Sequence, residues 1–250
     1  MKRLVTFFIC LLLFSVSTYA DKQFTAGEIS TIYKELENLL HVSPSYSLVV
    51  DERAEHSHSI DNDTGYYNII IKKDELNSTI LAHEMAHIFF FELLRKSNIS
   101  SEEIPLWYHE LVAMWFEQFM GSSSARILSF KCIFFNFTFF DTDYPQSEEL
   151  ELFYDSIGNF AEYLSKRYNF SSFVVESVEK YRYSGDLMAS LDAVLKTEFD
   201  KVVMRWRLTE LTPYFSFLLI VVIFIYLVLG RGDKRWRELK FDPKIPEDDL

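Results

Sequence analysis

An uncharged apolar run near the C-terminus, residues 211–230, constrains this chain more than any other feature of its sequence. Its length matches the ~20 residues that a helix needs to cross ~30 Å of hydrocarbon. A buried core helix is the alternative, but apolarity on all faces suits lipid better. A cluster of basic residues follows the run, as on the cytoplasmic side of membrane helices: Arg231, Lys234, Arg235, Arg237 and Lys240. The run therefore predicts a single-pass transmembrane helix in the cell membrane, with an extracytoplasmic N-terminal domain and a cytoplasmic tail at 231–250.

The first twenty residues predict that the chain enters a secretory pathway. A basic start at Lys2 and Arg3, an apolar run to Phe14 and a small or polar end at Thr18 to Ala20 are typical of a secretory signal peptide. An uncleaved N-terminal anchor is the alternative, but the apolar run is short for a membrane span. Residues 21–210 are then predicted to form one extracytoplasmic domain.

Charge and cysteine content exclude some partners and some stabilising devices. The chain has a net charge of −12, so nucleic acid is not an expected partner. Cys10 lies in the predicted signal peptide, which leaves Cys132 alone and without an intrachain disulfide. The domain must therefore be held together by packing.

Hydrophobic periodicity predicts an α+β fold with a small N-terminal sheet and a mostly helical remainder. Strands are expected at 45–50 and 66–71, joined by a polar loop that contains His56 and His58. Helices are expected at 26–42, from Asn77 or Ser78 to 96, from 105 to 121, and through most of 147–207. The aromatic segment 127–140 fits either a strand or a buried loop.

The segment His83-Glu84-Met85-Ala86-His87 carries the chemistry of the chain. It is an HExxH motif on a predicted helix, where residues four apart share one face and two imidazoles can hold one zinc ion. Glu84 lies beside them and can act as the general base toward a water activated by zinc. The metzincin pattern does not continue, because Phe90 and Leu93 stand where that pattern has glycine and histidine.

Glu110 is the next candidate for a third ligand, and His109 competes with it. Adjacent helical residues point about 100° apart, so only one of the two can face the metal, and Glu110 is preferred.

The helix with the motif, followed by Pro105-Leu106-Trp107-Tyr108-His109-Glu110-Leu111-Val112-Ala113, resembles gluzincins of the peptidase MA-like group. The resemblance implies a metallopeptidase fold over roughly residues 45–207, with Glu110 as the third zinc ligand. It also implies a recurring glutamate at Glu117, which is expected to be a solvated or outer-shell carboxylate.

Three departures from that pattern limit what the resemblance implies. Leu111 replaces the usual glycine and is expected to crowd the approach of the two helices. Met114 stands where a thermolysin-like relative has an acidic residue, so another group must orient His83. No GxMEN-like segment precedes the motif, so the aminopeptidase activity of one branch is not implied.

Tyr154 and Tyr108 are the candidates for a donor to the oxyanion of a peptidase. Together these features predict an extracytoplasmic endopeptidase with one Zn2+ ion, a peptide or protein substrate, and the lipid bilayer as a partner of its C-terminal helix. The alternative is a non-catalytic binding or sensor domain that keeps the fold. Leu111 favours this alternative, because it departs from the peptidase pattern beside the proposed ligand. An intramembrane protease is excluded, because the apolar stretch around the motif is too short and too polar to span a bilayer.

Overall fold

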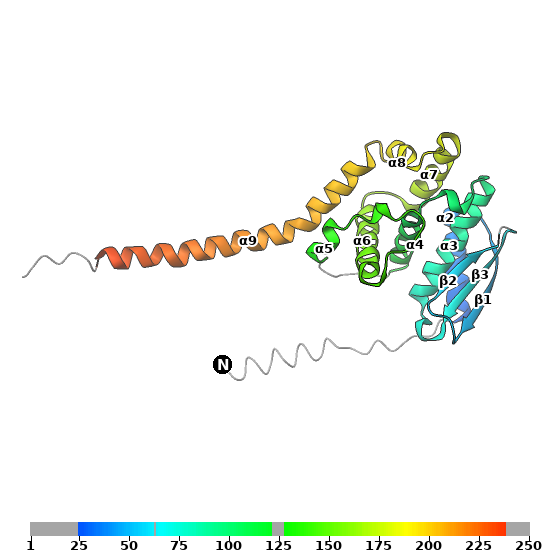
Figure 1. The fold of residues 1–250 in the computed structure, drawn as a ribbon, viewed down its shortest axis with the longest axis horizontal. Helices are drawn as coiled ribbons and strands as arrows, with labels where there is room; N and C mark the ends of the chain where they lie inside the picture. The colour runs from blue at the N-terminus through cyan, green and yellow to red at the C-terminus, as the bar shows by residue number, and fades with distance from the viewer. Residues whose placement is uncertain (1–24, 63, 122–127, 239–250) are drawn as a thin grey trace, which may run out of the picture. The chain divides into compact units, whose positions relative to one another are not determined.

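The computed structural model describes residues 25–62, 64–121 and 128–238. The predicted signal peptide and the end of the predicted tail lie outside these residues. The chain divides into two compact units between Val202 and Val203. The first unit holds a sheet and helices α2 to α8, and the second holds most of the long helix α9 (Figure 1).

A three-stranded sheet forms the N-terminal part of the first unit. Its order is β1-β3-β2, with β1 parallel and β2 antiparallel to β3. The strands are β1 (Ser45–Asp51), β2 (His58–Asp61) and β3 (Tyr66–Lys72). The central strand buries every second side chain, Tyr67, Ile69 and Ile71, as the two-residue period of a strand requires.

Strand β2 corrects the prediction of a polar loop between the two expected strands. It pairs with β3 from His58, opposite Ile70, to Asp61, opposite Tyr67. The strand is defined by main-chain hydrogen bonds to β3. It lacks the alternating apolar pattern of a predictable strand, because Ile60 is its only apolar residue. His58 therefore belongs to a strand at the edge of the sheet.

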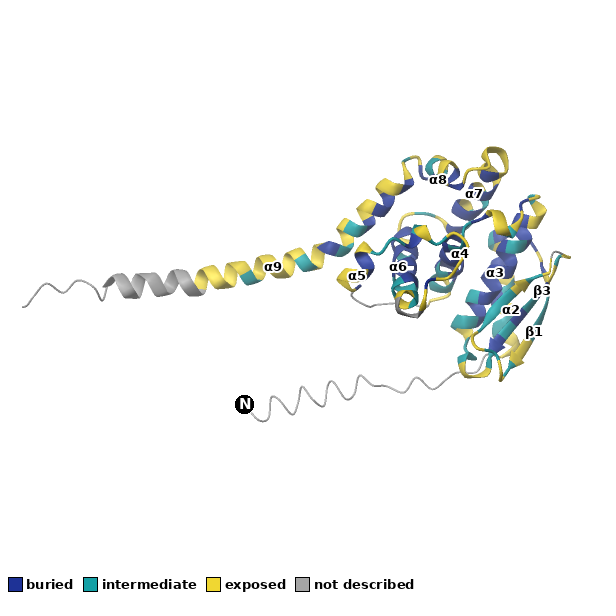
Figure 2. Ribbon diagram, in the orientation of Figure 1, coloured by how far each residue is buried: buried dark blue, intermediate teal, exposed yellow. Residues whose placement is uncertain are grey.

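Two helices accompany the sheet, α2 (Ala26–Leu40) and α3 (Ser78–Lys96). Helix α2 begins in a capping box between Thr25 and Glu28, and it ends two residues earlier than predicted because His41 adopts a left-handed conformation. Helix α3 has the predicted bounds and contacts α2, β2 and β3. Most of its side chains are buried, which makes it the central helix of the unit (Figure 2).

The remaining helices of the first unit lie in the second half of the chain. They are α4 (Leu106–Phe119), α5 (Phe130–Phe134), α6 (Ser147–Ser165), α7 (Phe170–Ser184) and α8 (Leu187–Leu195). The aromatic segment forms the short α5 and a 3-10 helix at Phe137–Phe139, so it is neither a strand nor a plain loop. Helix α4 packs between α3 and α6. The described residues thus form the predicted α+β fold, mostly helical with a small sheet.

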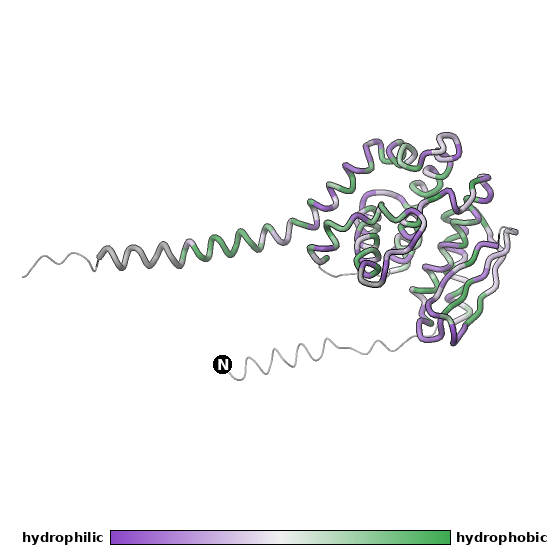
Figure 3. Tube along the Cα trace, viewed as in Figure 1, coloured by the Kyte–Doolittle hydropathy of each residue, from purple (hydrophilic) through white to green (hydrophobic). Residues whose placement is uncertain are grey.

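Helix α9 (Phe199–Glu238) accounts for the second unit. Among the described residues, its part Phe199–Leu227 is the one helix long and apolar enough to cross a membrane. Most of the apolar side chains from Phe215 to Leu227 are exposed. Figure 3 shows a long hydrophobic stretch along α9. The hydroxyls of Thr212 and Ser216 donate to carbonyls four residues earlier, at 3.0 and 2.9 Å. These two hydroxyls are thereby satisfied within the helix.

Candidate metal centre

Helix α3 presents two imidazoles on one face. Asn77 caps the helix by accepting a hydrogen bond from the Ile80 N–H at 2.9 Å. Residues four apart are neighbours on a helix surface, and the rings of His83 and His87 lie 4.8 Å apart between centroids. Their Nε2 atoms face each other at 3.1 Å. Two nitrogens this close can share one ion.

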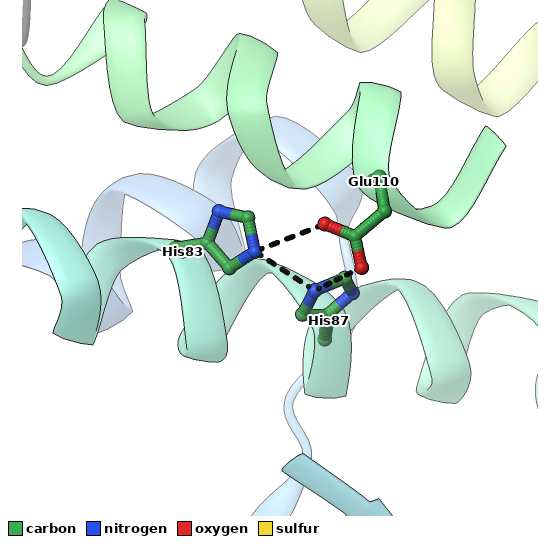
Figure 4. A group of neighbouring side chains, drawn as sticks. All are labelled: His83, His87 and Glu110. Atoms are coloured by element: carbon green, nitrogen blue, oxygen red, sulfur yellow. Dashed lines mark hydrogen bonds and ion pairs between the residues drawn. The ribbon is translucent and has the colours of Figure 1, made fainter. Parts of the chain in front are cut away.

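Helix α4 brings a carboxylate to these imidazoles (Figure 4). Glu110 Oε2 lies 3.3 Å from His83 Nε2, and Glu110 Oε1 lies 3.6 Å from His87 Nε2. One ligand atom from each of the three residues lies within 4.8 Å of the other two. Figure 4 shows the three side chains converging from two neighbouring helices. The structure therefore brings together the three residues predicted as metal ligands.

The residues of this cluster fit a metal ion. Glu110 is fully buried, at 0% exposed, and its Oε2 atom makes no hydrogen bond with any residue that the structure describes. A buried carboxylate oxygen without a hydrogen bond is costly unless a positive charge lies beside it. Two imidazole nitrogens and a carboxylate oxygen are donors that divalent transition metals accept. A cation at this point would satisfy all three.

The charges within the cluster depend on one another. Burial lowers the pKa of His83, but the carboxylates of Glu110 and Glu117 outweigh it and raise the pKa to about 10. Burial lowers the pKa of His87 to about 3. Burial raises the pKa of Glu110, but the two histidines outweigh it and lower the pKa to about 2. The groups are thus arranged to hold one positive charge between them, either a proton on His83 or a metal ion in its place.

A second carboxylate holds the far side of the His83 ring. Glu117 Oε2 lies 3.4 Å from His83 Nδ1, the nitrogen opposite the one that faces His87. Histidines that bind metals use their other ring nitrogen for such a partner, which fixes the orientation of the ring. The sequence required a group for this task, because Met114 occupies the position of the expected acidic residue. Glu117 is the residue that the structure places there.

Leu111 and Met114, the two departures on α4, are accommodated in different ways. Leu111 is fully buried, yet α3 and α4 still pack side by side, so its side chain does not keep the helices apart. Met114 packs against α6 at Gly158, where an added Cβ would lie 2.6 Å from the Met114 Cε atom. Gly158 therefore allows the close contact between α6 and Met114 of α4.

The neighbouring histidine on α4 points away from the cluster. His109 Nε2 lies 3.0 Å from the carbonyl oxygen of Ser101. Its ring packs beside Phe90 and Phe91, at 5.1 and 5.4 Å between centroids. Of the two candidates for a third ligand, the structure places Glu110 at the histidines of α3.

Glu84, the predicted base, lies beside the cluster and outside its ligand set. It is buried, and burial raises the pKa of its carboxyl. Ser59 on β2 donates to Glu84 Oε2 at 2.8 Å, and the same hydroxyl lies 2.9 Å from the Glu84 carbonyl oxygen. A carboxyl with a raised pKa can accept and return a proton near neutral pH. Sequence reasoning missed Ser59, because its strand has no strand-like pattern.

Three tyrosines differ in their access to the cluster. The Tyr108 hydroxyl lies 2.5 Å from Ser177 Oγ in the core, away from the histidines. Tyr154 on α6 packs against Phe153, at 5.5 Å between centroids, and burial followed by the charge of Glu110 raises its pKa. Tyr144, which was not a sequence candidate, donates to Glu110 Oε1 at 2.6 Å. It stands in an irregular segment before α6, and no spacing rule links it to α4.

Comparison of the chain with protein-family models, curated protein sequences and solved structures found no match. Three findings stand on the chain's own residues. The first unit has an α+β fold, and it contains a His83/His87/Glu110 group compatible with a metal ion. One helix of the described residues is long and apolar enough to cross a membrane.

Proposed function

We propose that this chain is a membrane-anchored zinc metallopeptidase of the gluzincin type. The observation that supports it best is the His83/His87/Glu110 group, in which His87 and Glu110 are buried, with Glu84 beside it. Two histidines and one glutamate are a ligand set of catalytic zinc, which keeps a further position open for water or substrate. The same HExxH segment accounts for two ligands and the base.

Each residue of the site has a role in this proposal. A zinc ion held by the three ligands would supply a Lewis acid that polarises a peptide carbonyl and makes water more acidic. Glu84 takes a proton from the attacking water and returns it to the leaving amine. Tyr154 donates a hydrogen bond to the developing oxyanion, and its raised pKa keeps the hydroxyl protonated. Glu117 keeps the His83 ring in place.

The proposed substrates are polypeptides outside the cytoplasm and close to the membrane. The apolar part of α9 is the proposed anchor, and the basic residues after it orient the first unit outward. A tether of this kind favours substrates near the bilayer. Nucleic acid is not a proposed partner, because the net charge is −12.

Zinc content and peptide hydrolysis of the purified full chain test the proposal. We expect about one zinc ion per chain in the wild type, and hydrolysis of a fluorogenic peptide that a chelator abolishes. Glu110→Gln should weaken zinc affinity by more than the roughly 10–100-fold that loss of an outer-shell partner costs. His109→Gln is the matched control, because His109 is the adjacent buried residue outside the cluster. It should keep its zinc.

Two other results would change the conclusion. A wild-type chain without zinc would remove the metal site and the peptidase together. A chain that binds zinc but hydrolyses no peptide would favour the non-catalytic binding or sensor domain.

A further inference from the structure

We infer that Tyr144 is a positioning residue of the metal site, which holds Glu110 by its Oε1 atom and leaves Oε2 to face the metal. The inference rests on the metal site of the proposed function. It does not depend on peptide hydrolysis.

The two oxygens of the Glu110 carboxylate lie in different surroundings. Oε1 accepts a hydrogen bond from the Tyr144 hydroxyl at 2.6 Å. Oε2 is buried, makes no hydrogen bond with a described residue, and lies 3.3 Å from His83 Nε2. Both oxygens lie beside an imidazole, since Oε1 is 3.6 Å from His87 Nε2, but only Oε1 has a hydroxyl donor.

This difference between the two oxygens affects whether Glu110 binds a metal ion through one oxygen or through both. A carboxylate can offer one oxygen or both to a metal ion, and a tetrahedral zinc site with an open position needs only one. A hydroxyl that donates to a carboxylate at this distance makes a strong, charge-assisted hydrogen bond. If Oε1 also bound the ion, it would have to share its electron density between the hydroxyl and the metal, which weakens both interactions. Tyr144 thus favours binding through Oε2 alone and limits rotation of the Glu110 side chain.

The surroundings of Tyr144 allow its hydroxyl to be removed without disturbing the packing of the fold. The residue is 52% exposed, and its ring lies at the edge of Phe153, 6.5 Å away between centroids. Replacement by phenylalanine keeps the ring and removes only the donor. Tyr154→Phe is a matched control, because Tyr154 also packs against Phe153, at 5.5 Å between centroids, whereas the hydroxyl that donates to Glu110 is that of Tyr144.

Metal affinity of the full chain in detergent micelles tests the inference. Zn2+ affinity is measured by competition with a chromophoric chelator, and Co2+ binding by its visible absorption. We expect Tyr144→Phe to weaken Zn2+ binding about 10–100-fold, as for other outer-shell partners, and Tyr154→Phe to stay close to wild type. In Tyr144→Phe the freed Oε1 can join the ion, and a higher coordination number should weaken the Co2+ absorption.

The possible outcomes separate this inference from the proposed function. An unchanged or stronger Zn2+ affinity in Tyr144→Phe overturns the inference and leaves the metal site intact. An equal loss in Tyr154→Phe also overturns it, because the effect would not be specific to the Glu110 contact. Lower thermal stability of chelator-treated Tyr144→Phe than of chelator-treated wild type would assign the loss to folding and overturn it. No Zn2+ binding by the wild type would remove the site itself.

Discussion

Helix α3 carries two buried glutamates, Glu84 and Glu92, that the surrounding protein treats differently. Each accepts a hydrogen bond from a hydroxyl of the sheet, Glu84 from Ser59 at 2.8 Å and Glu92 from Tyr67 at 2.9 Å. Glu92 also accepts two hydrogen bonds from the guanidinium of Arg95, at 2.7 and 2.8 Å. Among the described residues, Glu84 forms no ion pair with a lysine or an arginine.

The Arg95 guanidinium explains why the pKa values of the two carboxyls shift in opposite directions. Burial raises the pKa of both, but at Glu92 the hydrogen bonds from Arg95 and Tyr67 outweigh burial and lower the pKa. At Glu84 burial prevails and the pKa is raised. A carboxylate with its own cation stays charged and ties a helix to a sheet. A carboxylate without one can exchange a proton, which is what a general base needs.

Exchanging each glutamate for glutamine tests the comparison most strongly. Glu84→Gln should lower kcat/KM for a peptide by roughly 10²–10⁴-fold, because it removes the proposed general base. Glu92→Gln should leave kcat/KM unchanged and lower the free energy of unfolding by about 1.5–3 kcal/mol, because it weakens charged hydrogen bonds. Peptide hydrolysis and urea unfolding of the full chain measure both. The comparison breaks if Glu92→Gln is the variant that loses activity with its zinc retained.

The pH dependence of stability should report on Glu92. Its pKa is lowered in the folded protein relative to an unfolded value of about 4.3, so its contribution is complete above the unfolded value. The contribution is lost as the pH falls through the folded pKa, because the unfolded chain binds the proton first. Urea unfolding of wild type and Glu92→Gln should differ most at pH 7 and converge below about pH 4. A difference that grows on acidification would contradict the assigned sign.

The hydroxyls of the sheet provide a smaller test. Ser59→Ala should lower kcat by up to roughly 10-fold with KM unchanged, because a hydrogen bond contributes about 1 kcal/mol net. Tyr67→Phe removes the matching hydroxyl at Glu92 and should lower stability without affecting kcat. Steady-state kinetics at saturating zinc, with thermal unfolding as the second measurement, distinguish the two. Equal effects on kcat would show that the hydroxyls do not act through their own glutamates.

Local features of the fold were predictable because local spacing specifies them. Helix α3 has the predicted bounds, since Asn77 caps it and basic residues end it at Lys96. Strand β2 was not predictable, because an edge strand with one apolar residue depends on its partner β3 for definition. The aromatic segment at 127–140 was ambiguous for a similar reason, since its packing partners come from other helices.

The residues of the site also divide into those that local sequence patterns identify and those that they do not. His83 and His87 needed only the period of one helix to be placed together, and Glu84 was identified by its position between them. Ser59 and Tyr144 could not be found, because each reaches the site from a segment distant in sequence. No local pattern distinguishes these residues from the other serines and tyrosines of the chain.

The sequence by itself determined the apolar run of α9, the HExxH helix and the α+β class, because each depends on composition or on a period within one segment. The tertiary structure placed Glu110, and not His109, beside His83 and His87, and it placed Glu117 at the other nitrogen of the His83 ring. It also gave Glu84 and Glu92 their different environments. These outcomes depend on how α3, α4 and the sheet pack. Burial and the distance to an opposite charge, rather than residue type, set the pKa and the role of a carboxylate.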